Sequence, residues 1–358
     1  MTLISPPTSG PYGTLAEFTA QLDGPAEGGS GIPNQVVEFS LGSQRRQIVT
    51  DANGRASVAF PLIGIVGQDV LQVSFAGNAT YKGSIAFAPF TINRQATSLI
   101  LDPQPGSGQY SDNTNLQATL FAGADRRLPN TSVFFVAGTP AETLSATSTN
   151  VTDYAGRAPA GPVNLPAGIY PVTVYFLGAI PLGNGQTIIL SDSRYLASTG
   201  TGSLVQSAED STVTYTGQTT VPSGGALATS ALVVQADDGS PGDLTRASVE
   251  YVVRNGLNQV VATVTGSVTA GGVSVASIPG LPDGKYTLTA QVVGGYFASP
   301  ISAPTQITVG VPTAVTLSTF SVDGAGDLRW LPWLIVVVGI GAMLAAGLKQ
   351  HRSIRHSA

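Results

Sequence analysis

Two segments of this chain, about one hundred residues apart, share their residue types and their spacing. The first consists of Ile32–Gly42 followed by Thr50–Ala56, and it returns as Leu128–Gly138 followed by Thr152–Ala158. Each copy reads Pro-Asn, then a run rich in apolar residues, then Thr-Asp-x-x-Gly-Arg-Ala. An internal repeat of this length, built from short runs and turns, predicts a tandem series of β-sandwiches.

The apolar runs of the repeat alternate with a period of two. Val37, Phe39 and Leu41 are expected to face a core, whereas Glu38 and Ser40 face solvent, as in a half-buried strand. The same inward alternation is expected at Leu71, Val73, Phe75, Val133, Phe135, Ala137, Val172, Val174 and Phe176.

The Thr-Asp-x-x-Gly part of the repeat is expected to form a tight turn between antiparallel strands. Asp51 can accept hydrogen bonds from within a type I turn, and Gly54 can adopt the positive φ that closes it. The third repeat carries its own turn signals at Asn255-Gly256 and Gly271-Gly272.

This order of elements resembles a known family. A strand, a Thr-Asp-x-x-Gly-x-Ala turn, another strand and then Phe75–Tyr81 is similar to the bacterial immunoglobulin-like (Ig-like) repeats of surface adhesins and stalk proteins. The resemblance is close in the first two repeats and looser in the third. It implies a seven-stranded sandwich, extracellular placement and a role in adhesion or spacing, and it carries no shared catalytic residues.

We therefore expect an all-β chain of three tandem Ig-like sandwiches, at residues 1–94, 95–204 and 205–311. Aligning the first repeat with the second places Met1 inside the first strand, so the chain is expected to begin part-way through a repeat of a longer protein. The Gly-containing stretch Ser198–Gly202 is expected to form a loose connection between the second and third sandwiches.

A Leu-Pro-x-Gly-x-Tyr motif occurs at Leu165–Tyr170 and again at Leu281–Tyr286. It resembles the tyrosine corner of Ig-type sandwiches, in which the tyrosine hydroxyl bonds to an upstream backbone group. Asp69 stands at the corresponding place in the first repeat, so we expect the first sandwich to close this corner in another way.

An insertion in the second repeat, residues 179–191, has no counterpart in the first. One interpretation is a hairpin that covers its own sandwich. The other is a recognition loop, because ligand contacts concentrate on insertions held by a rigid scaffold.

The composition excludes several kinds of chemistry. Acidic residues outnumber basic ones by 21 to 16, so the chain lacks the basic surface that binding to nucleic acid requires. It has no cysteine, which excludes disulfides, thiolate zinc sites and a cysteine nucleophile. The two histidines, His351 and His356, lie near the C-terminus, so histidine-dependent hydrolysis and typical zinc catalysis are unavailable to the preceding residues. We expect no enzymatic activity.

Residues 330–348 form a run of 19 uncharged, mostly apolar residues. At ~1.5 Å per residue a helix of this length spans about 28 Å, close to the ~30 Å thickness of a hydrocarbon core. Basic residues at 349–358 place this tail in the cytoplasm and the sandwiches outside, by the positive-inside rule. We expect a linker at 312–329, a single transmembrane helix at 330–348 and a basic cytoplasmic tail at 349–358.

One loop has the composition of a metal site. Asp237, Asp238 and Asp243 lie within the short segment Ala236–Asp243 and can gather oxygen ligands for calcium. The alternative is a solvated acidic turn. Calcium is the one cofactor that the sequence suggests.

Together these patterns predict a non-enzymatic, single-pass membrane protein of the cell surface that acts as an adhesive or spacing stalk. Its expected partners are the membrane and a surface protein or glycan. One alternative is a stalk that carries an upstream catalytic or binding domain missing from this chain, which the coding sequence upstream of Met1 would reveal. A second is a carbohydrate-binding module that uses exposed aromatic residues and the 179–191 loop.

Overall fold

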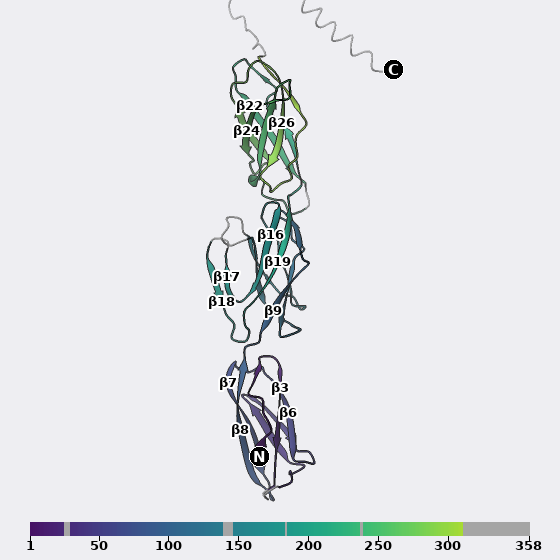
Figure 1. The fold of residues 1–358 in the computed structure, drawn as a ribbon, viewed down its shortest axis with the longest axis vertical. Helices are drawn as coiled ribbons and strands as arrows, with labels where there is room; N and C mark the ends of the chain where they lie inside the picture. Colours follow the sequence, from purple (N-terminus) through teal and green to yellow (C-terminus); the bar gives the residue numbers. More distant parts are fainter. Residues whose placement is uncertain (25–28, 139–145, 183–184, 237–238, 311–358) are drawn as a thin grey trace, which may run out of the picture. The chain divides into compact units, whose positions relative to one another are not determined.

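In the computed structural model, the described residues are 1–24, 29–138, 146–182, 185–236 and 239–310. These residues form β-strands joined by turns, with one short 3₁₀ helix, η1 (Leu244–Arg246). Figure 1 shows the strands grouped into sandwiches that follow one another along the chain. The expectation of an all-β chain is confirmed for this part of the protein.

The first sandwich has a three-stranded and a five-stranded sheet. The three-stranded sheet has the order β1 (Thr2–Leu3), β3 (Leu15–Gln21), β6 (Arg55–Pro61). The five-stranded sheet has the order β2 (Ser9–Pro11), β8 (Lys82–Asn93), β7 (Gly67–Gly77), β4 (Val36–Leu41), β5 (Gln44–Val49). β2 runs parallel to β8, whereas the other neighbours are antiparallel.

The second sandwich repeats this arrangement with additions. One sheet is built around β11 (Gln117–Ala122), which pairs with β9 (Thr97–Asp102), β12 (Arg126–Arg127) and β15 (Arg157–Pro159). The other has the order β10 (Gly106–Gln109), β19 (Ser198–Ser207), β16 (Gly168–Phe176), β13 (Ser132–Ala137), β14 (Ala146–Val151). β10 runs parallel to β19.

The third sandwich follows the same plan. Its smaller sheet has the order β20 (Ser211–Tyr215), β22 (Leu227–Gln235), β25 (Val273–Ile278). Its larger sheet has the order β21 (Thr220–Val221), β27 (Thr305–Val309), β26 (Gly284–Val293), β23 (Ser248–Arg254), β24 (Val260–Ser267). β21 runs parallel to β27.

All three sandwiches therefore share one topology, in which the first strand is split between the two sheets. In the first and third sandwiches the expected seven strands become eight because each half of that strand pairs with a different sheet, and the second sandwich adds β12 and the β17–β18 hairpin to the same eight. In the first two sandwiches the break contains two prolines, Pro6 and Pro7 in one and Pro103 and Pro105 in the other. Proline lacks the backbone N–H that a continuous strand needs, so the chain leaves one sheet there and joins the other.

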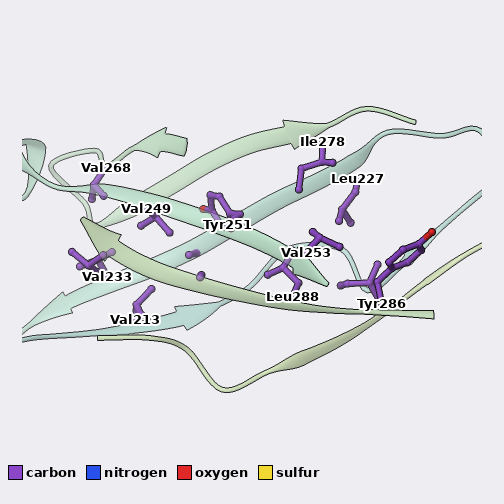
Figure 2. Close-up of a cluster of buried hydrophobic side chains, with 14 of the residues drawn as sticks. Val213, Leu227, Val233, Val249, Tyr251, Val253, Val268, Ile278, Tyr286 and Leu288 are labelled. Atoms are coloured by element: carbon purple, nitrogen blue, oxygen red, sulfur yellow. The ribbon is translucent and has the colours of Figure 1, made fainter. Parts of the chain in front are cut away.

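Each sandwich encloses its own apolar core. Val37 and Phe39 are fully buried and Leu41 is nearly so, which confirms the predicted alternation in β4. The other residues expected to face inward are buried as well: Leu71, Val73, Phe75, Val133, Phe135, Ala137, Val172, Val174 and Phe176. Figure 2 shows the corresponding cluster of the third sandwich, where Val249, Tyr251 and Val253 of β23 lie among side chains of the facing sheet.

The predicted turn chemistry is confirmed in both copies. The Asp51 carboxylate accepts hydrogen bonds from the N–H groups of Asn53 and Arg55, each at 2.8 Å. Asp153 accepts equivalent bonds in the second sandwich. Gly54 has φ 76° and Gly156 has φ 69°, the left-handed conformation that glycine adopts without steric cost.

The two predicted tyrosine corners are also present. The Tyr170 hydroxyl donates to the Pro166 carbonyl at 2.9 Å, and the Tyr286 hydroxyl donates to the Pro282 carbonyl at 2.8 Å. Each bond spans four residues and holds the chain as it enters β16 or β26.

The prediction that Ser198–Gly202 form a loose connection is wrong. These residues lie within β19 and pair with β16, from Ser198 opposite Phe176 to Gly202 opposite Val172. Glycine lowers strand propensity, but here a neighbouring strand supplies hydrogen-bond partners along the whole segment. The next connection is the short segment between β19 and β20.

One residue of the second repeat joins the core of the third sandwich. Tyr110 is 3% exposed and belongs to the apolar cluster of β20–β27. Its ring centroid lies 5.0 Å from that of Tyr296 and 5.5 Å from that of Phe297. Edge-to-face aromatic contacts of this kind are stabilising beyond the area they bury, so the two repeats share packing at this point.

Among the described residues, no helix is long and apolar enough to cross a membrane. The predicted linker (312–329), transmembrane helix (330–348) and basic tail (349–358) all lie outside those residues.

Candidate binding surfaces

The acidic loop of the third sandwich is only partly described. Asp237 and Asp238 lie outside the described residues. The Asp243 carboxylate caps η1, where it accepts hydrogen bonds from the Thr245 hydroxyl at 2.6 Å and the Thr245 N–H at 3.0 Å. These two bonds, together with the nearby charge of Arg246, hold the pKa of Asp243 below its ordinary value.

Asp243 is therefore occupied as a helix cap, which is a structural role that needs no metal. Within the described part of the chain, no group of three or more His, Cys, Asp or Glu side chains is placed to hold a metal ion. Because two of the three proposed ligands are not described, the calcium loop stays a prediction.

The insertion at 179–191 forms a hairpin of β17 (Gly178–Pro181) and β18 (Thr187–Leu190). Figure 1 shows it beside the second sandwich, as a separate two-stranded sheet. Ile180 is fully buried, whereas Ile189 on the other strand is 80% exposed. The hairpin thus buries Ile180 and leaves Ile189 in solvent. Burial of Ile180 agrees with a hairpin that covers its own sandwich, and exposure of Ile189 agrees with a recognition loop.

A broader surface lies on the outward face of the five-stranded sheet in the first sandwich. Cross-strand pairing places outward residues in two rows across β5, β4, β7 and β8. The first row is Gln47, Glu38, Ser74 and Ile85, and the second is Arg45, Ser40, Gln72 and Phe87. Four strands ~4.8 Å apart make each row about 14 Å long.

The chemistry of these rows is mixed. Phe87 is 59% exposed and Ile85 is 50% exposed, so an aromatic ring and an aliphatic side chain stand in solvent at one end. At the other end the Glu38 carboxylate accepts from the Arg45 guanidinium at 3.0 Å and from the Gln47 amide at 3.3 Å. We call this set of eight residues the Phe87 face.

A shallow hollow of about 500 Å³ adjoins the Phe87 face. Glu38, Gln47 and Ser74 line it from the face itself, and Asn78 lines it from the end of β7. The Asn78 amide donates to the Gln35 side-chain carbonyl at 2.8 Å, which fixes the orientation of the rim. Amide and carboxylate groups held in this way offer both donors and acceptors to a ligand.

The sequence did not point to this face because β8 inverts the usual pattern. Its larger apolar residues, Ile85 and Phe87, are exposed, whereas Ala86 and Ala88 on the opposite side are partly buried. Alternation by itself assigns large apolar residues to the core. The one clue in the sequence was that alanines, Ala86 and Ala88, alternate with the large residues and so could occupy the inward positions of the strand.

No protein-family model matches the chain, and no curated protein matches it. Among solved structures it is similar to a tetra-tandem repeat from the extending region of a large adhesion protein, with 15% identity, a TM-score of 0.44, and coverage of 83% of this chain and 71% of that chain. It is also similar to invasin, a bacterial integrin-binding protein, with 15% identity, a TM-score of 0.35, and coverage of 86% and 59%. A third is the three N-terminal domains of the bacteriophage RB49 outer capsid protein Hoc, with 12% identity, a TM-score of 0.31, and coverage of 85% and 96%.

At these TM-scores the likenesses carry no weight for function. The assignment of Ig-like sandwiches rests on the strand order of this chain, with three copies of one two-sheet topology and a first strand split between the sheets.

Proposed function

We propose that this chain is a non-enzymatic, membrane-anchored protein of the cell surface whose tandem Ig-like sandwiches form an adhesive or spacing stalk. The observation that carries the proposal is the recurrence of one sandwich topology three times in succession. Repetition of a folded unit adds length and surface without adding an active site, which is what a stalk requires.

The anchor is supported by the sequence. Residues 330–348 are uncharged and mostly apolar, with Trp330 and Trp333 at one end and basic residues directly after the other. Tryptophan favours the interfacial region of a bilayer, and basic residues favour its cytoplasmic side. This arrangement supports a single span with the sandwiches outside the cell.

The absence of cysteine from the chain makes the topology directly testable. The full chain, expressed in a bacterium behind a cleavable export signal, would carry a single cysteine introduced as Ser43→Cys in the first sandwich or as Ser357→Cys in the tail. A membrane-impermeant maleimide should label the Ser43→Cys variant in intact cells. It should label the Ser357→Cys variant only after lysis.

A matched truncation ending at residue 329 controls for the anchor. This protein should be released from the membrane fraction, whereas the full chain should stay with it. Recovery of the full chain in the soluble fraction, or labelling of both cysteines in intact cells, would contradict the anchored topology.

The Phe87 face favours a second, compatible function, which is the binding of a neutral saccharide. Sugars present apolar C–H faces that pack on aromatic rings, together with hydroxyls that need donors and acceptors side by side. Phe87 supplies the ring, and Gln72, Gln47 and Glu38 supply the polar groups on the same sheet face. Because Glu38 is already paired with Arg45, the face carries little unbalanced charge.

A glycan array probed with the full chain in detergent tests this function. We expect Phe87→Ala to weaken binding by about 2- to 10-fold, the effect of losing an aromatic contact worth roughly 0.5–1.5 kcal/mol. Tyr154→Ala is the matched control, because Tyr154 is a 92% exposed aromatic residue on a turn of the second sandwich. Equal binding by both variants, or no binding by the wild type, would remove this function and leave the stalk untouched.

A further inference from the structure

Short linkers connect neighbouring sandwiches. Arg94–Ala96 joins β8 to β9, and Ala208–Asp210 joins β19 to β20. Each linker residue keeps two rotatable backbone bonds, so a short linker does not by itself prevent bending. Relative motion of neighbouring domains is the ordinary expectation unless the contacts between them oppose it. The contacts around each linker therefore decide how far one sandwich can turn against the next.

Both linkers are held by the same pattern of backbone hydrogen bonds. The N–H of Gln95, the middle residue of the first linker, donates to the Arg194 carbonyl at 2.8 Å, and its carbonyl accepts from the Leu196 N–H at 2.9 Å. The N–H and carbonyl of Glu209, the middle residue of the second linker, form the corresponding bonds, at 2.9 Å and 2.7 Å, with the loop that follows β26. Each linker is thus attached to the sandwich that comes after it.

A tyrosine from the preceding sandwich crosses each joint. Tyr12 directly follows β2, and its ring centroid lies 5.8 Å from that of Tyr195. Tyr110 directly follows β10, and its ring centroid lies 5.0 Å from that of Tyr296. Both tyrosines end a Ser-Gly-x-Tyr segment, whereas Pro222 stands at the equivalent place after β21 in the third sandwich. The shared topology therefore does not require the tyrosine, which in the described part of the chain occurs where another sandwich follows.

The two tyrosines are held in different ways. Tyr110 is 3% exposed and belongs to the core of the third sandwich, although its backbone continues β10 of the second. Tyr12 is partly buried and packs against the core of its own sandwich. Its contacts across the joint are the edge of the Tyr195 ring and the Arg194 guanidinium, whose carbon lies 5.9 Å from the Tyr12 ring centroid. Exposed cation–π contacts of this kind are weak.

The second joint also has direct hydrogen bonds away from its linker. The Ser111 hydroxyl donates to the Ser240 carbonyl at 2.6 Å, and the Ala167 N–H donates to the Gly295 carbonyl at 2.8 Å. Ser111 and Ala167 belong to the second sandwich and their acceptors to the third. A joint attached at several separate places resists bending and twisting more than one held by its linker and a ring contact.

We propose that the joint between the second and third sandwiches is stiff and that the chain bends at the joint between the first and second. Turning the third sandwich against the second has to withdraw the Tyr110 ring from an apolar core, which exposes aromatic surface to water. Turning the first sandwich against the second disrupts the contacts of Tyr12 with Tyr195 and Arg194 and leaves both cores intact.

This inference rests on the proposed stalk function and gives it a mechanical form. The second and third sandwiches act as one arm that continues into the anchor segment. The first sandwich, which carries the Phe87 face, can reorient on that arm. A binding face at the movable end of a stalk can turn toward a ligand while the arm maintains its distance from the membrane.

Pairs of nitroxide spin labels in the full chain measure both joints. Because the chain has no cysteine, Gln47→Cys with Thr147→Cys labels the first joint, and Thr147→Cys with Thr263→Cys labels the second. The three sites are exposed and lie on equivalent edge strands, β5, β14 and β24. Double electron–electron resonance in detergent gives the distribution of distances between the two labels of a pair. We expect a narrow distribution across the second joint and a broad one across the first.

Substitutions at the second joint test its cause. Tyr110→Ala should broaden the second distribution to about the width of the first, and Tyr154→Ala, which removes an exposed tyrosine of the same sandwich, should leave both distributions unchanged. Tyr110→Ala also removes a side chain from the third core, so Ser111→Ala is the milder variant. It loses only the hydrogen bond to Ser240 and should broaden the second distribution by a smaller amount, with unchanged thermal unfolding.

Equal widths across the two joints of the wild type would overturn the proposal. A second distribution that stays narrow in both Tyr110→Ala and Ser111→Ala would overturn it as well. Neither result affects the anchored topology, which maleimide labelling measures separately. Loss of the anchor would in turn leave the two distance distributions as they are, so failure of the stiff joint and failure of the stalk function are distinguishable.

Discussion

The Thr50 hydroxyl donates a 2.8 Å hydrogen bond to the carbonyl of Ile32, eighteen residues earlier in the chain. The same oxygen accepts the N–H of Gln35 at 2.9 Å, and Thr50 is only 2% exposed. In the second sandwich the Thr152 hydroxyl donates to the Leu128 carbonyl at 2.7 Å. One buried hydroxyl therefore ties the two halves of the repeated segment together, which explains why both halves recur.

Replacing this hydroxyl is expected to destabilise the first sandwich. Thr50→Val keeps the shape of the side chain but leaves the Ile32 carbonyl and the Gln35 N–H without it. A buried polar group that loses its partner costs about 1–3 kcal/mol. Hydrogen–deuterium exchange, read by peptide, should show faster opening of β4 and β5 in the full chain, with the second and third sandwiches unchanged.

Thr19→Val is the control for this experiment. The Thr19 hydroxyl bonds to the Ser57 hydroxyl at 2.8 Å on an exposed part of β3, where water can replace it. We expect little change in exchange. Equal effects of the two substitutions would mean that burial of the Thr50 hydroxyl is not what matters.

Local patterns in the sequence were sufficient for the strands and turns. Alternation assigned Val37, Phe39 and Leu41 to the core because every second residue of a strand faces one side. The Asp51 turn and the Tyr286 corner were predictable because their hydrogen bonds join residues at most four apart. Such contacts are set by the chain itself and do not depend on the rest of the fold.

Contacts between distant residues were not predictable in this way. Nothing local marks Tyr110 as a member of the third core, or Phe87 as an exposed residue beside Gln72 of the neighbouring strand. Ser198–Gly202 were expected to be loose because of their glycines, and the pairing with β16 that orders them was not visible in the sequence. Pairing between strands decided the cases of Phe87 and Ser198–Gly202, and packing between aromatic residues outside the strands decided the case of Tyr110.

Gly54 is expected to tolerate no side chain. A Cβ atom there would lie 2.6 Å from the Leu22 carbonyl oxygen and 2.6 Å from the Ile32 nitrogen, both of which are backbone atoms. Gly54→Ala therefore combines a steric clash with the strain of φ 76°, which alone costs about 1–2 kcal/mol. Thermal unfolding of the full chain should show a large loss of stability confined to the first sandwich.

Gly224→Ala separates the steric clash from the strain of a positive φ. Gly224 has φ 72°, but a Cβ atom there would meet nothing within 4 Å. This variant should show the strain without the clash, and so a smaller loss in the third sandwich. A loss of stability as large as that of Gly54→Ala would show that the backbone around Gly54 shifts to accommodate a Cβ atom and that the clash adds little to the strain.

The tyrosine corners are expected to contribute modestly. Tyr286→Phe removes the hydroxyl that holds Pro282 and should lower the stability of the third sandwich by about 0.5–1.5 kcal/mol, the usual net value of one hydrogen bond. Tyr170→Phe should act similarly on the second sandwich. Tyr154→Phe, at a fully solvated ring, is the control and should be neutral in urea unfolding. A neutral Tyr286→Phe would indicate that water replaces the bond.

The stability of the third sandwich is expected to fall at high pH through Tyr215. Burial, with a smaller effect of neighbouring Tyr251, raises the pKa of Tyr215 to about 12. The Tyr215 hydroxyl donates to the Gln218 carbonyl at 2.8 Å, and its ring lies 6.4 Å from that of Tyr251. In the unfolded chain a tyrosine titrates near pH ~10. The unfolded state therefore loses its proton first, and the stabilising contribution, complete below pH ~10, is lost as the pH rises through about 12.

The measurement is the difference in unfolding temperature between the wild type and Tyr215→Phe, taken at intervals from pH 8 to pH 12. At pH 8 the wild type should be the more stable, because it keeps the bond to Gln218. The difference should shrink steadily above pH ~10, since only the wild type has a proton to lose at this position. A constant difference across the whole range would show that Tyr215 ionises as readily in the folded protein as in the unfolded chain.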